Sequence, residues 1–182
     1  LKEPPLQLDE PDEALPVHRL EETYRLPPES AALHTELFYA QDGIRLQSAG
    51  EEQHLPETDG RMDDILNSEH RVTLLVHSEA KSQKTNPVEQ ALTLELLDEG
   101  GFLESRETGD DSLKAGVVVP FRAQRAKIAE SVPSTVQVDT VERFQGGERD
   151  LMILSMTASD RGYISMVSDF LLEPNRFNVG AS

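Results

Sequence analysis

The chain has 182 residues, and because a domain typically holds roughly 150, this length predicts one compact domain with connecting segments. Its 17 Lys and Arg against 34 Asp and Glu give a net charge of -17, which argues against coating nucleic acid through bulk positive charge but leaves local contacts open. Cysteine is absent, so disulfides, thiolate zinc sites and cysteine nucleophiles are excluded.

Much of the acidity lies in three segments. Residues 1–16, 42–70 and 98–114 carry net charges of -4, -6 and -4, which leaves -3 for the rest of the chain. We interpret them as an acidic, proline-rich lead-in at 1–16 and two solvated acidic loops near 42–70 and 98–114. Residues 17–182 form the expected domain, whose structured part is close to neutral.

Three helices are predicted, over residues 29–39, 86–98 and 122–131. The second has the clearest start signals, because Asn86 is a natural N-cap, Pro87 suits the first helical position and Glu89 lies three residues after the cap. Such a spacing is typical of a capping box.

Four strands are predicted, at 71–77, 116–119, 135–138 and 151–157. Each is apolar on both sides of the pleat, as strands covered by helices on both faces should be. Strands that alternate with helices predict a three-layer α/β domain with a mostly parallel sheet and helices on both faces. Ligands of such a domain bind at the carboxyl ends of its strands.

Several familiar catalytic patterns are absent from the sequence, including GxxxxGK[ST], GxGxxG, HExxH and GxSxG. The five histidines show no metal-ligand spacing, so no metal site is predicted. The longest apolar runs are far shorter than the roughly 20 residues of a membrane helix. Residues 1–10 do not resemble a signal peptide. We therefore expect an intracellular, cytoplasmic domain with no membrane partner, with a nuclear location open if the source is eukaryotic.

Two segments carry candidate ligand-binding side chains near turns. In ETYRLPPES, Tyr24 and Arg25 precede a proline pair, and the planar fork of Arg25 suits a phosphate, although packing of Tyr24 and a local ion pair of Arg25 would also explain them. In VVVPFRAQ, a buried strand ends at Pro120 and Phe121. There Phe121 could stack on a base and Gln124 could reach a phosphate or a base edge, or the Phe could simply pack.

Two further segments lie later in the chain. In VDTVERFQGGERD, Asp139 and Glu142 have capping-box spacing on a short helix whose start near Thr140 could hold a phosphate. Gly146 lets the backbone approach a ligand and Glu148 can accept hydrogen bonds from sugar hydroxyls. EPNRFNVGAS reads as a helix start that runs into the chain end.

In this order, the four segments resemble the second RecA-like motor domain of superfamily 1 helicases, in particular the up-frameshift and DNA-replication helicase group. The segments are similar to its Tyr-Arg-x-x-Pro motif, its strand-turn-Gln motif, its V-D-x-x-x-x-Q-G-x-E-x-D motif and the opening of its final motif. NPVEQALTLELL resembles its Asn-x-x-Glu-Ala helix. The likeness covers roughly residues 17–182. One departure is Val119-Pro120-Phe121, where many relatives have Thr-Pro-Tyr.

The resemblance implies a P-loop NTPase-type fold and ATP-driven movement on single-stranded DNA or RNA. By this likeness, Arg25 would be an arginine finger at the γ-phosphate, Tyr24 would lie by the base or ribose, and Gly146 and Glu148 would line the nucleotide.

Pro120, Phe121, Gln124 and Thr140 would hold the nucleic-acid strand. ATP and Mg²⁺ would be held mainly by an N-terminal RecA-like domain of the same parent chain. The 182 residues alone, which end within the last motif, are expected to be inactive.

Two other interpretations stay open from the sequence. One is a helicase-derived module that binds nucleic acid or a partner protein without turnover. The other is a flavodoxin-like or receiver-like domain, although a receiver would have a lysine late in the chain and the last lysine here is Lys127. The track, DNA or RNA, is not fixed by the sequence.

Overall fold

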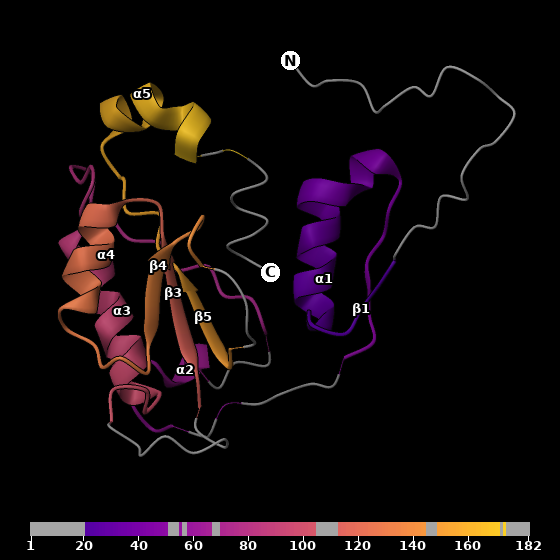
Figure 1. Cartoon of the computed structure of the whole chain (residues 1–182), viewed down its shortest axis with the longest axis horizontal. Helices are drawn as coiled ribbons and strands as arrows, with labels where there is room; N and C mark the ends of the chain where they lie inside the picture. The colour runs from indigo at the N-terminus through magenta and orange to yellow at the C-terminus, as the bar shows by residue number, and fades with distance from the viewer. Residues whose placement is uncertain are drawn as a thin grey trace, which may run out of the picture.

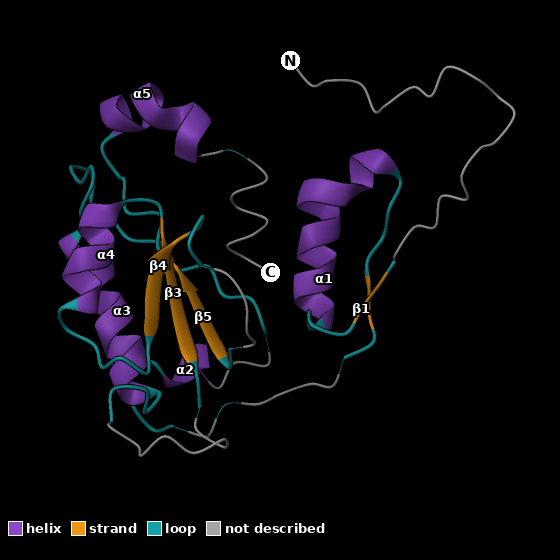
Figure 2. Cartoon of the chain, viewed as in Figure 1, coloured by secondary structure: helices purple, strands orange, loops and turns teal. Residues whose placement is uncertain are grey.

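The computed structural model describes residues 21–50, 55, 58–66, 70–104, 113–144, 149–171 and 173. At its centre lies a parallel sheet with the strand order β4-β3-β5 (Figures 1 and 2). The strands are β3 (Ala115–Val119), β4 (Gln137–Thr140) and β5 (Leu151–Leu154). The strand predicted at 116–119 is confirmed and begins one residue earlier, at Ala115. The strand predicted at 151–157 begins at Leu151 as predicted but ends at Leu154, and the strand predicted at 135–138 lies two residues later.

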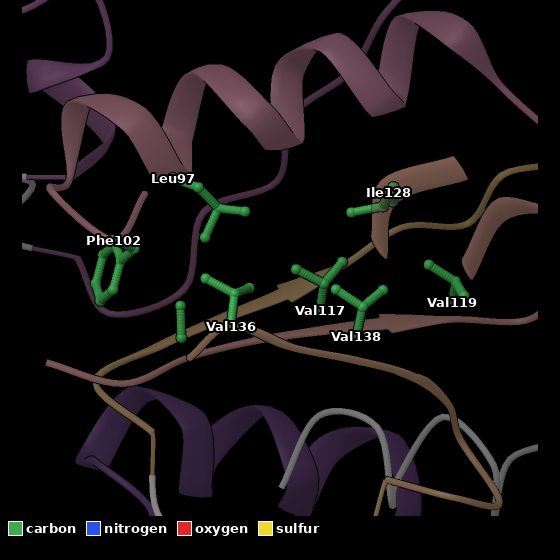
Figure 3. Packing of buried hydrophobic residues seen from close by; sticks show 8 residues of the cluster. Leu97, Phe102, Val117, Val119, Ile128, Val136 and Val138 are labelled. Carbon is green, nitrogen blue, oxygen red and sulfur yellow. The ribbon is translucent and has the colours of Figure 1, made fainter. Parts of the chain in front are cut away.

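Two helices cover one face of this sheet. They are α3 (Pro87–Glu99) and α4 (Arg122–Ala129), both close to their predicted bounds. A single apolar cluster fills the space between these helices and the strands (Figure 3). Its buried members are Leu97, Phe102, Ala115, Val117, Val119, Ile128, Val136 and Val138. Because every residue of β3 is buried, this central strand accounts for much of the core.

The amino-terminal part of the described chain lies on the opposite face of the sheet, as Figures 1 and 3 show together. It contains β1 (Glu22–Thr23), which pairs in parallel with β2 (Gln47–Ser48), and α1 (Pro28–His34). A π-helical segment (Thr35–Tyr39) and a 3₁₀ turn (Ala40–Asp42) continue α1. The sheet therefore has helices on both faces, which confirms the predicted three-layer α/β arrangement.

Two further helices lie at opposite ends of the strands. The short helix α2 (Asp63–Leu66) buries Leu66 together with Met62 and Leu96. The helix α5 (Arg161–Leu171) lies at the carboxyl ends of the strands (Figure 1). In this position α5 covers the edge where ligands of parallel sheets bind.

The strand predicted at 71–77 is wrong. Residues 72–80 form neither a strand nor a helix, and Leu74 and Val76 are 86% and 85% exposed. The apolar run alone does not form a strand, because a strand also needs a ladder with a neighbour. Here a cavity separates this segment from the edge strand β5.

Candidate functional site

A large cavity lies between the edge of the sheet and the amino-terminal part of the described chain. Its volume is about 740 Å³, which is within the range of small-molecule sites. Stretches from distant parts of the sequence line it, among them the β1–α1 connection, residues 73–77, α3, and β5 with the loop that follows it. Its polar and charged lining includes Tyr24, Arg25, His77, Glu79, Arg149, Ser155 and Ser159.

Tyr24 and Arg25 are held at this cavity by a tight turn. The hydroxyl of Thr23 accepts hydrogen bonds from the backbone N–H groups of Arg25 and Leu26, both at 3.3 Å. The turn ends at the proline pair that begins α1, with Pro28 in its first turn. The side chain of Tyr24 is 74% exposed. The ETYRLPPES segment thus presents an aromatic ring and a guanidinium at the mouth of one cavity.

The segment VDTVERFQGGERD is anchored on both sides of its glycines. Before them, the ring of Phe144 packs over Gly116 of β3, where a Cβ would lie 2.5 Å from Phe144 Cζ. After them, the guanidinium of Arg149 lies 5.9 Å from the centroid of the same ring. Asp150 Oδ2 accepts a hydrogen bond from the backbone of Lys114 at 2.6 Å.

Gly146 and Glu148, the predicted nucleotide-lining residues, lie outside the described residues. The structure describes the residues just before and just after this segment, and both lie beside β3. Both Phe144 and Arg149 line the cavity that Tyr24 and Arg25 also line. Two motifs more than a hundred residues apart in the sequence therefore meet at one cavity.

The short helix predicted after Asp139 is wrong. Thr140 is the last residue of β4 and is buried, and its carbonyl accepts hydrogen bonds from the backbone of Arg143 and Phe144, each at 2.9 Å. Residues 141–143 form only a turn. Asp139 Oδ1 accepts from the backbone N–H of Thr140 at 2.9 Å and lies 3.4 Å from Arg125 Nε. The carboxylate of Asp139 thus contacts the backbone of β4 and the side chain of Arg125 in α4, and it caps no helix.

Pro120 and Phe121 lie at the carboxyl end of β3, as predicted, and α5 covers Phe121. The ring of Phe170 is stacked on Phe121 with centroids 5.7 Å apart, and the ring of Tyr163 lies at 5.9 Å. Phe121 is therefore half-buried in an aromatic cluster. Phe170, which belongs to α5, is 38% exposed. The sequence predicted that Phe121 could stack on a base, but it did not predict the contacts of Phe121 with Tyr163 and Phe170.

Gln124 is fully buried rather than directed into solvent. Its Oε1 accepts a hydrogen bond from the backbone N–H of Asn86 at 2.9 Å, and its Nε2 donates to the carbonyl of Asn86 at 3.2 Å. Both ends of the amide are occupied by the backbone at the start of α3. In this conformation Gln124 supports the strand-end surface from inside.

Glu79 and His77 are polar cavity residues that the sequence analysis did not single out. Glu79 accepts hydrogen bonds from the hydroxyl of Ser159 and the backbone of Lys81 and Ser82. These bonds, that of Ser159 foremost, lower the pKa of Glu79 from 4.5 to about 2. His77 Nδ1 accepts from the backbone N–H of Glu79 at 3.2 Å, which leaves Nε2 to donate toward Glu89 at 3.3 Å. No local motif signals these residues.

Among the described residues, no group of three or more His, Asp or Glu side chains is arranged to hold a metal ion. None of the described helices is both long enough and apolar enough to cross a membrane.

The parallel sheet, its helices on both faces and the motif segments at its strand ends define a RecA-like α/β domain of the P-loop NTPase type. The chain belongs to an AAA domain family, whose model matches residues 7–182. Two curated proteins are similar to it. A DNA replication ATP-dependent helicase/nuclease of Arabidopsis thaliana is 30% identical over 104 residues, which cover 56% of this chain and 7% of that protein.

The second relative is an uncharacterized ATP-dependent helicase of Caenorhabditis elegans. It is 27% identical over 179 residues, which cover 94% of this chain and 11% of that protein. The chain thus spans about a tenth or less of the length of these relatives.

Proposed function

We propose that this chain is the C-terminal motor half of an ATP-dependent superfamily 1 helicase that acts on DNA or RNA. The observation that carries the proposal is the common cavity of Tyr24 and Arg25 with Phe144 and Arg149, the residues that flank the glycines of QGGERD. Membership of an AAA domain family and likeness to two ATP-dependent helicases support it. In this proposal the chain works with another RecA-like domain, which holds most of the ATP and Mg²⁺.

The proposed nucleotide roles are those that the family resemblance implies, and the chemistry of Tyr24 and Arg25 at the cavity supports two of them. Arg25 is proposed to contact the γ-phosphate as an arginine finger, because a guanidinium can pair with two phosphate oxygens and stabilise developing charge. Tyr24 is proposed to lie against the base or ribose, and its large exposed fraction suits this contact. Gly146 and Glu148 are proposed to line the nucleotide, with Glu148 on a ribose hydroxyl. ATP, when bound, supplies the free energy of hydrolysis of its γ-phosphate bond, which in this proposal drives movement along the strand.

The strand track is proposed at the carboxyl ends of β3 and β4. Pro120, Phe121 and Thr140 all lie at this edge, where parallel sheets present ligands. Gln124 is fully buried, so we propose that it supports this surface from beneath, through its hydrogen bonds to the backbone of Asn86, and does not contact the strand itself. Contacts of this kind use backbone and stacking rather than base edges, so we expect little sequence preference.

The test is ATP turnover by the full-length protein that carries this chain, with and without oligo(dT) or oligo(U). We expect turnover that one of these strands stimulates. Arg25→Ala is expected to lower turnover about a thousandfold or more, as for other arginine fingers, while strand binding by fluorescence anisotropy is retained. Arg45→Ala is the matched control, because Arg45 is exposed in the same part of the chain and does not line the cavity.

Each other outcome points elsewhere. Unchanged turnover in Arg25→Ala would refute the arginine-finger role. An unaltered ATP affinity in Glu148→Ala would count against the ribose contact. A folded wild-type protein that binds a strand but does not turn over ATP would favour the non-catalytic binding module instead.

A further inference from the structure

A buried polar cluster joins the start of α3 to α4 and to the loop after β5. We call it the Asn86 cluster, and its members are Asn86, Glu89, Gln124, Ser155 and Thr157. Asn86, Gln124 and Thr157 are fully buried, Ser155 is 4% exposed, and the side chain of Glu89 is 14% exposed. Buried polar groups at this density are stable only when they are hydrogen-bonded, so each bond in the cluster constrains the loops that it joins.

The N-cap of α3 forms as its sequence predicts, but the carboxylate of Glu89 does not complete a capping box. Asn86 Oδ1 accepts from the backbone N–H groups of Val88 and Glu89 at 3.0 and 3.1 Å. In a capping box the side chain of Glu89 would accept from the backbone N–H of Asn86. Gln124 Oε1 takes that N–H instead, at 2.9 Å. The carboxylate of Glu89 is thereby available for another partner.

That partner is the turn that follows β5. Glu89 Oε2 accepts hydrogen bonds from Ser155 Oγ at 2.5 Å and from the backbone N–H of Thr157 at 2.9 Å. Its Oε1 accepts from Asn86 Nδ2 at 3.1 Å and faces His77 Nε2 at 3.3 Å. A carboxylate has about four acceptor positions, and these four donors occupy them. Glu89 also lines the cavity, but with these positions occupied its carboxylate is placed to hold protein groups rather than to bind a ligand.

The turn that Glu89 holds is in an unfavourable backbone conformation. Thr157 has a φ of 62°, the left-handed region that a β-branched residue rarely adopts. Both polar groups of its backbone are bound at the start of α3, because Glu89 accepts from its N–H and Asn86 Nδ2 donates to its carbonyl at 3.0 Å. Such a conformation persists only where its surroundings determine it.

The turn leads directly into α5. The carbonyl of Ser82 accepts hydrogen bonds from the backbone N–H groups of Ser159 and Asp160, both at 2.9 Å. Asp160 Oδ1 then accepts from the backbone N–H of Tyr163 at 2.6 Å in the first turn of the helix. The helix, which is kinked at Val167, places Tyr163 and Phe170 over Phe121, at the proposed strand track. The segment EPNRFNVGAS follows α5 in the chain.

We propose that Glu89 is a positioning residue of the motor domain: its carboxylate fixes the Ser155–Thr157 turn and, through this turn, the placement of α5 over the strand-end surface. The inference rests on the proposed function, because α5 matters to turnover only if that surface contacts a nucleic-acid strand. Loss of the carboxylate releases the turn, so α5 no longer holds one position relative to Phe121.

The first measurement needs no activity. Amide hydrogen exchange is compared in wild type, Glu89→Ala, Glu89→Gln and Glu95→Ala. Glu95 is the matched control, because it lies on the same helix and pairs with the exposed Arg61 at 3.1 Å. We expect faster exchange at residues 155–171 in Glu89→Ala, an intermediate rate in Glu89→Gln, which keeps one acceptor for Thr157, and no change in Glu95→Ala or in β3. Equal exchange in Glu89→Ala and Glu95→Ala would overturn the proposal.

The second measurement is strand-stimulated ATP turnover of the full-length protein. Glu89→Ala is expected to lower kcat by roughly 2- to 30-fold, the range typical of residues that couple sites, with little change in the KM for ATP. Glu89→Gln is expected to restore part of kcat. A raised KM with unchanged kcat would refute the positioning role, because it would indicate a contact to ATP.

The two proposals fail in different ways. If Glu89→Ala does not fold, Glu89→Gln alone carries both comparisons with Glu95→Ala. If wild type has no turnover, the proposed function fails, whereas the exchange rates still decide whether Glu89 holds the turn and α5.

Discussion

Gly116, in the interior of β3, leaves no room for a side chain. A Cβ at this position would lie 2.5 Å from Cζ of Phe144 and 2.8 Å from Sδ of Met152, well inside the roughly 3.5–4 Å at which carbon atoms make favourable contact. Gly116→Ala must therefore push the Phe144 ring away from the sheet. Overpacking of this kind costs about 1–3 kcal/mol of unfolding free energy, and each kcal/mol lowers the Tm of a domain of this size by roughly 2–4 °C.

The assay is urea unfolding followed by circular dichroism, with a double-mutant cycle. Phe144→Leu removes the ring atoms that the new methyl group would meet, so Gly116→Ala should cost less in the Phe144→Leu background than in wild type. Gly162→Ala in α5 is the control. It makes the same chemical change in the first turn of the helix, where the nearest atom is Asp160 Oδ1 at 3.3 Å and no ring has to move.

Two results would refute this reasoning. One is a Gly116→Ala protein as stable as wild type, and the other is an unchanged cost in the Phe144→Leu background. The expected result has a functional side, because Phe144 directly precedes the segment that contains Gly146 and Glu148. If these residues line the nucleotide as proposed, Gly116→Ala also weakens ATP binding.

Three other predictions follow from the contacts of single side chains. Because the Ser159 hydroxyl and nearby backbone N–H groups lower the pKa of Glu79 from 4.5 to about 2, the stabilisation from this carboxylate should be complete above pH 4.5 and disappear as the pH falls toward 2. The urea midpoints of wild type and Glu79→Gln should therefore converge between pH 4.5 and 2, and a constant difference would contradict the lowered pKa. Phe170→Ala should raise the rate of amide exchange in α5 but not in β3, because a stacked aromatic pair contributes about 0.5–1.5 kcal/mol beyond its buried area. Phe170→Leu is the control, and equal exchange rates in both variants would show that ring stacking on Phe121 is unimportant. Leu74→Ser should leave the unfolding free energy unchanged, because Leu74 is 86% exposed, and it should reduce self-association measured by light scattering. A clear loss of stability would mean that Leu74 is buried in solution.

The sheet could be predicted where burial and pairing agree. The sequence of β3 is apolar on both faces, and in the structure the strand has a partner on each side and is buried throughout. The segment 71–77 is also rich in apolar residues but is not paired with the edge strand β5. Hydrophobic pattern reports which residues favour burial, whereas a strand also requires a neighbour at hydrogen-bonding distance, which depends on distant parts of the chain.

The candidate site could be predicted in composition but not in its contacts. Motif order drew attention to Tyr24, Arg25 and the VDTVERFQGGERD segment, and the cavity brings together their described parts. Motif order gave no sign that Phe121 lies beneath Phe170, because aromatic stacking across 49 positions leaves no local pattern. The same holds for Glu79, whose partner Ser159 is 80 residues away.

Glu89 shows most clearly where local interpretation ends. Its spacing from Asn86 correctly indicates the start of a helix, and an isolated peptide would use the carboxylate for the nearest free N–H. In the folded domain Gln124, which lies 38 residues after Asn86, takes the N–H of Asn86, and Glu89 instead binds Ser155 and Thr157. A polar side chain at a helix start can thus satisfy either its own helix or a distant loop, and only the assembled core decides between them. Because the distant choice binds the helix to a strained turn, it makes the geometry of the turn after β5 depend on the start of α3.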